Sequence, residues 1–192
     1  MHHRRLFTFL VGLWLGGTLL IRWVEDQNFA MIGRVLTAQP QQMQQIIFTL
    51  TDIEKKNLFR YVASEMNRFY SGNWEWIQLG LGVILMVGIV LAKEPRQYLI
   101  MAACMTLAVM ACHFLLTPQL IGIGRMIDFL PLDQSLDERK RFASLGIFYL
   151  IVDILKFGAG VAMLVQWLRR GPSEKRKRRS VKLDEIPYPN YN

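Results

Sequence analysis

Two ionisable residues stand in the middle of a long apolar stretch, where charge is unusual. The stretch runs from Phe142 to Leu168, and Asp153 and Lys156 lie near its centre. Placing one such charge against lipid costs on the order of 3 kcal/mol. Because residues three apart share one face of a helix, we expect the two side chains to form an ion pair that faces protein or water.

Arg22 ends another apolar stretch and has two interpretations. It either snorkels to a membrane interface and pairs locally with Glu25 and Asp26, which follow it at helical spacing. Or it turns inward to meet Glu75 or Asp153. The second interpretation would join Arg22 to a polar cluster inside a bundle of helices.

Glu75 and Gln78 open a further apolar stretch behind an aromatic pair, Trp74 and Trp76. Tryptophan is common at membrane interfaces, so one interpretation of Glu75 is a hydrated interfacial carboxylate. The other is a polar stripe that enters the bundle, since Ser71 and Gln78 share a helical face with Glu75 close by.

His113 is the one histidine outside the N-terminal pair His2 and His3. The main interpretation is a structural histidine held by a hydrogen bond, and a titrating role is an alternative. A single histidine also ligates haem or chlorophyll, which leaves a pigment contact as a minor possibility. We otherwise expect no cofactor, and no metal site, because neither a CxxCH nor an HExxH motif accompanies it.

The remaining residue types do not suggest catalysis. Cys104 and Cys112 stand about 12 Å apart along a helix, too far for a disulfide or a shared metal ion, so we interpret them as packing residues. No pairing of a nucleophile with a base and no phosphate-binding loop occurs. We therefore predict that the protein is not an enzyme and has no catalytic residue.

The elements that must position these residues are membrane-spanning helices. The chain has 192 residues, of which 52% are hydrophobic, and its apolar runs cover about residues 6–24, 74–92, 98–116 and 142–168. A span needs about 20 apolar residues to cross the hydrocarbon layer. The pattern predicts one all-α integral membrane domain over residues 1–192, a bundle of four transmembrane helices. Gly12 and Gly16 in the first run favour close packing with another helix, of this chain or of a second copy.

The net charge of +8 is distributed unevenly beside the runs. Arg4 and Arg5 precede the first run, Lys93 and Arg96 lie between the second and third, and basic residues follow the fourth. Positive residues favour the cytoplasmic side, so both termini are expected in the cytoplasm, most simply of a bacterial inner membrane. Nucleic acid is not an expected partner, since no nucleic-acid-binding motif is present.

The loops between the runs have their own patterns. Residues 25–73 are expected to form a helical cap on the outer face, with short helices around 29–36, from near Pro40, and over 53–70. Pro118 is expected to end the third span.

Residues 169–192 read as a basic cytoplasmic tail. Such a tail is attracted to anionic lipids or binds a partner subunit. The residues expected to make these contacts are Lys175, Arg176, Lys177, Arg178 and Arg179.

Three short motifs resemble an uncharacterised bacterial four-helix membrane family, domain of unknown function 4149, which is similar to copper-resistance-D-like and transmembrane-protein-205-like proteins. They are Gly12-Leu-Trp-Leu-Gly16-Gly17, Asn28-Phe29, and Thr117-Pro118 followed by Arg125. The resemblance implies the four-span topology. The family pattern has a proline before that phenylalanine and a histidine near the start of the last span. This chain has Gln27-Asn28 and Ser144-Leu145-Gly146 there, so no metal-related role is carried over.

Two functions are consistent with these patterns. The first is a non-enzymatic accessory or scaffold subunit of a larger membrane complex, with other membrane subunits as partners. The alternative is a small transporter or a proton- or ion-coupled channel that uses Asp153 and Lys156.

Overall fold

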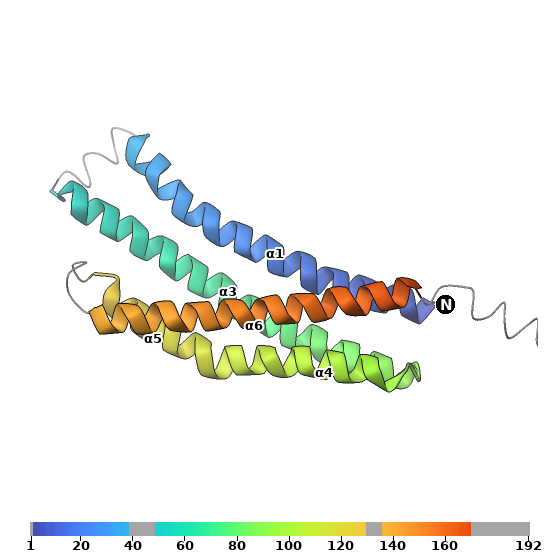
Figure 1. The fold of residues 1–192 in the computed structure, drawn as a ribbon. Helices are drawn as coiled ribbons and strands as arrows, with labels where there is room; N and C mark the ends of the chain where they lie inside the picture. The colour runs from blue at the N-terminus through green and yellow to red at the C-terminus, as the bar shows by residue number, and fades with distance from the viewer. Residues whose placement is uncertain (1, 39–48, 130–135, 170–192) are drawn as a thin grey trace, which may run out of the picture.

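A computed structural model describes residues 2–38, 49–129 and 136–169, and over these residues the fold is helical with no strand. The helices follow the chain from α1 to α6 (Figure 1). Their bounds are α1 (His2–Thr37), α3 (Asp52–Leu91), α4 (Arg96–Ala111), the π-helical turn η1 (Cys112–Leu116), α5 (Thr117–Ile127) and α6 (Leu136–Arg169).

Four helical stretches are long and apolar enough to cross a membrane, and the four predicted spans fall on them. They are α1, α3, α6 and the continuous stretch Arg96–Ile127 that joins α4, η1 and α5. At 1.5 Å per residue the 40 residues of α3 extend about 60 Å, roughly twice the thickness of the hydrocarbon layer. About half of α3 therefore extends beyond the length that a span requires.

The predicted cap of separate helices is wrong in its connectivity. Residues 29–36 and 53–70 are helical, yet they are continuations of α1 and α3 and not independent elements. No proline interrupts either stretch, and a break would leave backbone groups unpaired at two new helix ends. A capping box at Thr51 sets the start of α3: its backbone N–H donates to Glu54 at 2.7 Å. The helix expected to start near Pro40 lies outside the described residues.

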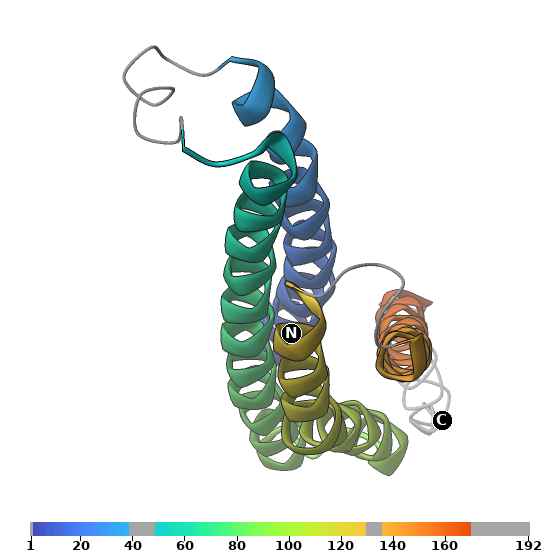
Figure 2. The same cartoon turned by 90° about the vertical axis from the view of Figure 1, so that its left-hand side faces the viewer.

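Pro118 does not end the helical stretch of the third predicted span, which continues to Ile127. The chain stays helical through η1, where the Thr117 backbone N–H donates to the Cys112 carbonyl five residues earlier. Proline lacks an N–H, and its ring clashes with the carbonyl four residues before it in a regular α-helix. The wider turn of η1 accommodates Pro118 near the start of α5, at the cost of a bend. Figure 2 shows α5 running in a different direction from α4.

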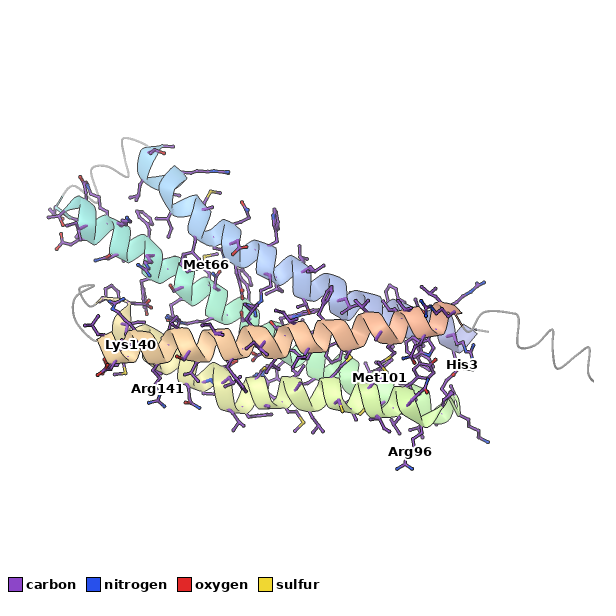
Figure 3. All side chains as sticks on the ribbon, in the orientation of Figure 1. His3, Met66, Arg96, Met101, Lys140 and Arg141 are labelled. Carbon is purple, nitrogen blue, oxygen red and sulfur yellow. The ribbon has the colours of Figure 1, made fainter. Side chains whose placement is uncertain are left out.

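The four stretches form a ring in which α1 and α4 each contact both α3 and α6. We call the end that holds the N-terminus, the turn between α3 and α4 and the last residues of α6 the closed end, and the opposite end the open end (Figure 1). His3 and Arg96 lie at the closed end, and Lys140 and Arg141 at the open end (Figure 3).

The apolar core fills the closed half of the ring. Phe7 and Tyr98 both lie against Trp167, with ring centroids 5.7 and 5.1 Å away. Arg4 Nε and Glu94 Oε1, 3.0 Å apart, connect α1 to the turn after α3. Large apolar side chains such as Leu107 and Leu155 remain exposed around the outside, as they would against lipid.

Glycines allow close approach at a few points of this ring. A Cβ on Gly17 would lie 2.0 Å from the Trp74 ring, so only glycine lets Trp74 cover α1 there. At Gly12 and Gly16, by contrast, an added Cβ would have no atom of the described chain within 4 Å. Among the described residues, the pair therefore does not bring a second helix close to α1.

Candidate functional site

Asp153 and Lys156 form a buried ion pair on α6, as their spacing predicts. Lys156 Nζ lies 2.7 Å from Asp153 Oδ1. Only 9% of Asp153 and 4% of Lys156 is exposed. The charges thus face the interior of the ring. There each charge compensates the other, whereas a single buried charge would destabilise the fold.

Arg22 makes both of the contacts that the sequence left as alternatives. One guanidinium nitrogen donates to Glu25 Oε2 at 2.9 Å, and the other donates to Asp153 Oδ2. The guanidinium also lies over the Tyr149 ring, 5.1 Å from its centroid. Asp153 therefore holds two cations, one from its own helix and one from α1.

Glu75 is not the hydrated interfacial carboxylate of the first interpretation, because only 1% of it is exposed. The hydroxyls of Thr117 and Tyr149 donate to Oε1, each at 2.7 Å. His113 Nδ1 lies 2.9 Å from Oε2. Three partners from η1, α5 and α6 thus surround one carboxylate on α3. Their hydrogen bonds offset the free-energy cost of burying that carboxylate.

His113 is the hydrogen-bonded histidine of the main interpretation. A carboxylate only accepts hydrogen bonds, so a bond from His113 to an ionised Glu75 requires the proton on Nδ1. Trp76 and Phe114 pack edge-on against the imidazole, with centroids 4.6 and 4.8 Å away. Among the described residues, no group of three or more histidine, cysteine, aspartate or glutamate side chains lies close enough to hold a metal ion.

Gln78 connects the ion pair to α1. Lys156 Nζ lies 3.5 Å from Gln78 Oε1, and Gln78 Nε2 donates to Thr18 Oγ1 at 3.0 Å. Trp74 Nε1 also donates to Thr18, at 3.3 Å. The six candidates that the sequence places in the apolar stretches, together with Thr18, Thr117 and Tyr149, thus form two adjacent groups that share Tyr149. We call them the ionic network.

Thr18, Thr117 and Tyr149 were missed from the sequence, although a signal was present. Tyr149 stands four residues before Asp153, and Thr18 four residues before Arg22, so each shares a helical face with a charged residue. Threonine and tyrosine are common in apolar helices, and the spacing alone does not tell a packing residue from a hydrogen-bond donor.

The polar contacts continue from the ionic network toward the open end. The Ser71 hydroxyl donates to Glu25, and Asn28 Nδ2 donates to Asn67 Oδ1 at 2.6 Å. Asn67 Nδ2 in turn donates to the Glu25 backbone carbonyl at 3.1 Å. These bonds set the register of α1 against the outer half of α3.

A cavity of about 890 Å³ opens between α1, α3, α5 and α6 at the open end. There α1 and α3 diverge from α5 and α6 (Figure 1). We call this cavity the vestibule. Arg22, Thr117 and Tyr149 line it and also contact the buried acids Asp153 or Glu75. The ionic network is therefore the floor of the vestibule.

Apolar side chains lie on the other side of the ionic network. Leu15, Met105 and Met163 are buried there, and the absence of a side chain on Gly160 lets Leu15 and Met105 pack against α6. The Thr106 hydroxyl at this level donates a hydrogen bond to the Ala102 carbonyl, at 2.8 Å. We call this layer the apolar plug, and it separates the vestibule from the closed end.

Comparison of the chain with models of protein families, with curated proteins and with solved structures found no match. The resemblance to domain of unknown function 4149 therefore stays a prediction. So does the contact of the basic tail with anionic lipids or a partner, because Lys175 to Arg179 lie outside the described residues.

Proposed function

We propose that the protein is an integral membrane protein of a bacterial inner membrane, with the closed end and both termini on the cytoplasmic side. Its four apolar stretches are long enough to span, and their outward surfaces are apolar. Arg4, Lys93, Arg96 and Arg169 gather toward the closed end, whereas the open end has both signs of charge, which follows the positive-inside pattern.

In that membrane the protein acts as a small ion-coupled transporter that binds its solute in the vestibule. The observation that supports this function is the position of the ionic network, between a cavity open on one side and an apolar plug on the other. A transporter exposes its binding site to one side of the membrane at a time. Buried ionisable residues in spanning helices are characteristic of ion and substrate pathways.

The ionic network offers a way to couple a solute to an ion. A negatively charged solute that reaches Arg22 competes with Glu25 and Asp153 for the guanidinium. A proton on Glu75 or His113 changes the charge in the adjacent group of the ionic network, where the Tyr149 hydroxyl donates to Glu75. Either event alters the charges that hold α1, α3 and α6 together, and a change in that balance is what opens one side and closes the other.

A channel is the weaker form of this function. Within the described residues, the apolar plug leaves no polar path from the network to the closed end. Conduction without a conformational change needs a continuous wet pathway, so alternating access fits the structure better.

Labelling of single cysteines tests the one-sided vestibule. In a background of Cys104→Ser and Cys112→Ala, Ser64→Cys lies on the vestibule wall and Thr106→Cys lies in the apolar plug. A membrane-impermeant maleimide added to intact cells should react with the first and not with the second. Reaction at both positions would show an open pathway, and reaction of Ser64→Cys only in inverted vesicles would reverse the proposed orientation.

The accessory or scaffold subunit is the second candidate, favoured by the exposed face at Gly12 and Gly16. A Cβ added at either position would have no atom of the described residues within 4 Å, and small residues let a helix of another subunit approach. Purification in a mild detergent, with native mass spectrometry of the complex and an absorbance spectrum, tests it. Stoichiometric partner chains or a pigment would support this role, and a chain without partners would exclude it.

A further inference from the structure

We propose that the vestibule binds an anionic amphiphile, a molecule with a carboxylate or phosphate head and one apolar body. The inference rests on the proposed function, because it assumes that the vestibule is the binding site. It adds the chemical class of the solute and the residues that select it.

The charges that line the vestibule have a positive excess. Five cations and three acids line it: Arg22, Lys56, Arg60, Arg68 and Arg139, and Glu25, Asp26 and Asp128. Several of these charges are already in contact with each other or with the backbone. Arg68 donates to Asp128 at 2.7 Å, Arg22 donates to Glu25, and Arg139 donates to the Ile127 carbonyl at 3.3 Å.

Lys56 and Arg60 have no ion-pair partner within 4.0 Å among the described residues, and both line the vestibule. They stand four residues apart on α3, on one helical face. Asp26 is the remaining acid of the lining, but it lies further from the open end than Lys56 and Arg60 do. Asn28, two residues after Asp26 on α1, is hydrogen-bonded to Asn67 on α3. Asn67 is seven residues past Arg60, about 10 Å further in. The two cations at the rim are thus positioned for the head of an anion.

Apolar side chains from α1, α5 and α6 form part of the wall between this rim and the floor, opposite polar side chains of α3 such as Ser64 and Asn67. Ile121 lies one turn of α5 past Thr117, and Leu150 follows Tyr149 on α6, while Phe29 and Phe142 add to this apolar part from α1 and α6. An apolar wall below a cationic rim favours a ligand with both characters, and free phosphate alone would leave that wall exposed to water.

The size of the cavity agrees with such a ligand. Pockets for small molecules span roughly 300 to 1,000 Å³, and the vestibule holds about 890 Å³. The same chemistry is available from two sources, a single-chain amphiphile in solution or the head and one chain of an anionic membrane lipid.

Protection of Ser64→Cys tests the inference with the full chain in phosphatidylcholine nanodiscs. Dodecyl phosphate should slow the reaction of this cysteine with maleimide, and equal concentrations of dodecyltrimethylammonium, dodecanol or inorganic phosphate should not. Lys56→Gln with Arg60→Gln should raise the half-protecting concentration of dodecyl phosphate about tenfold, as expected for two exposed charge contacts.

The matched control is Arg34→Gln with Lys55→Gln, which removes the same charge near the same end. Arg34 and Lys55 do not line the vestibule, so their replacement should leave the protection unchanged. Protection by phosphatidylglycerol nanodiscs without added ligand would support the inference with the lipid as the source. Protection by dodecyl phosphate alone would support it with a soluble source.

The remaining outcomes separate the two levels of the proposal. Equal protection by the cationic amphiphile, or loss of protection in both double variants alike, would overturn the ligand class and leave the vestibule as the binding site. Protection by inorganic phosphate alone would overturn the amphiphile, because it would show that no apolar body is needed. Absence of any reaction at Ser64→Cys without ligand, while Thr106→Cys reacts, would overturn the proposed function itself.

Discussion

Asp153 has two cationic partners, and this makes the members of the ionic network unequal. Lys156 Nζ lies 2.7 Å from one carboxylate oxygen, and Arg22 binds the other. Arg22 keeps a second acid, Glu25, 2.9 Å away. The loss of Lys156 would leave Asp153 paired, whereas the loss of Asp153 would leave Lys156 with no acid.

Leucine at these two positions should therefore have different effects. Asp153→Leu should lower the free energy of unfolding by about 3 to 5 kcal/mol, because it leaves a buried lysine uncompensated. Lys156→Leu should cost less than half of that. The double variant should recover most of the loss, because Arg22 still pairs with Glu25. Thermal unfolding in detergent measures all three, and equal losses from the two single variants would contradict the shared role of Asp153.

The hydroxyl of Tyr149 can be tested separately from its ring. Tyr149→Phe removes one donor from Glu75 and keeps the ring beneath the Arg22 guanidinium. We expect a loss of about 1.5 to 3 kcal/mol, typical of a hydrogen bond to a charged group. Tyr61→Phe is the control, since the Tyr61 hydroxyl makes no hydrogen bond among the described residues. A loss of equal size in both variants would mean that Tyr149 acts through general packing.

At the scale of the elements, the vestibule depends on the length of α1 and α3 and on the bend at η1. α1 and α3 are single long helices whose outer halves run past the length that a span needs. The bend at η1 redirects α5, so that α5 packs on α6 and the wall of the vestibule is completed there. Straight helices that packed along their whole length would leave no such cavity.

The contact between α1 and α3 beside this cavity depends on Gly17. Gly17→Ala should lower the stability by about 1 to 3 kcal/mol, because the added methyl group would overlap the Trp74 ring, which is also hydrogen-bonded to Thr18. Gly16→Ala makes the same chemical change one residue away, where the added Cβ has no atom of the described residues within 4 Å, and should be tolerated. Thermal unfolding of the two variants compares them, and equal stability would place Trp74 elsewhere.

At the scale of the whole molecule, polar groups are distributed by end. The closed half has an apolar core with basic residues at its edge, and the open half has ion pairs such as Arg125 with Glu65, at 2.8 Å. Such an arrangement supports the single orientation in a membrane that we propose. The apolar outer surface between the ends is the part that lipid would cover.

Reporter fusions check that direction. A fluorescent protein fused after Asn192 should fold and fluoresce in the cytoplasm, and alkaline phosphatase at the same position should be inactive, because the basic residues keep that end inside. The same reporters placed after residue 129 should give the opposite result. An active phosphatase after Asn192 would reverse the orientation and place the vestibule on the cytoplasmic side.

The sequence by itself determined those features that depend on neighbours along one helix. The four apolar stretches follow from composition and length, and the contact of Asp153 with Lys156 follows from a spacing of three residues on α6. Glu75, Gln78 and His113 could likewise be recognised as polar residues within apolar stretches from the sequence alone. None of these features requires knowledge of how one helix is rotated against the next.

Only the tertiary structure decided which helices meet and how far they separate. The burial of Glu75 depends on donors from η1, α5 and α6, and the inward position of Arg22 depends on α6 lying beside α1. The π-helical turn η1 allows the helix to continue past Pro118. The shape of the vestibule depends on the same turn. The physical reason is that helical periodicity states which residues share a face, while the rotation and crossing of helices follow from side-chain packing over the whole molecule.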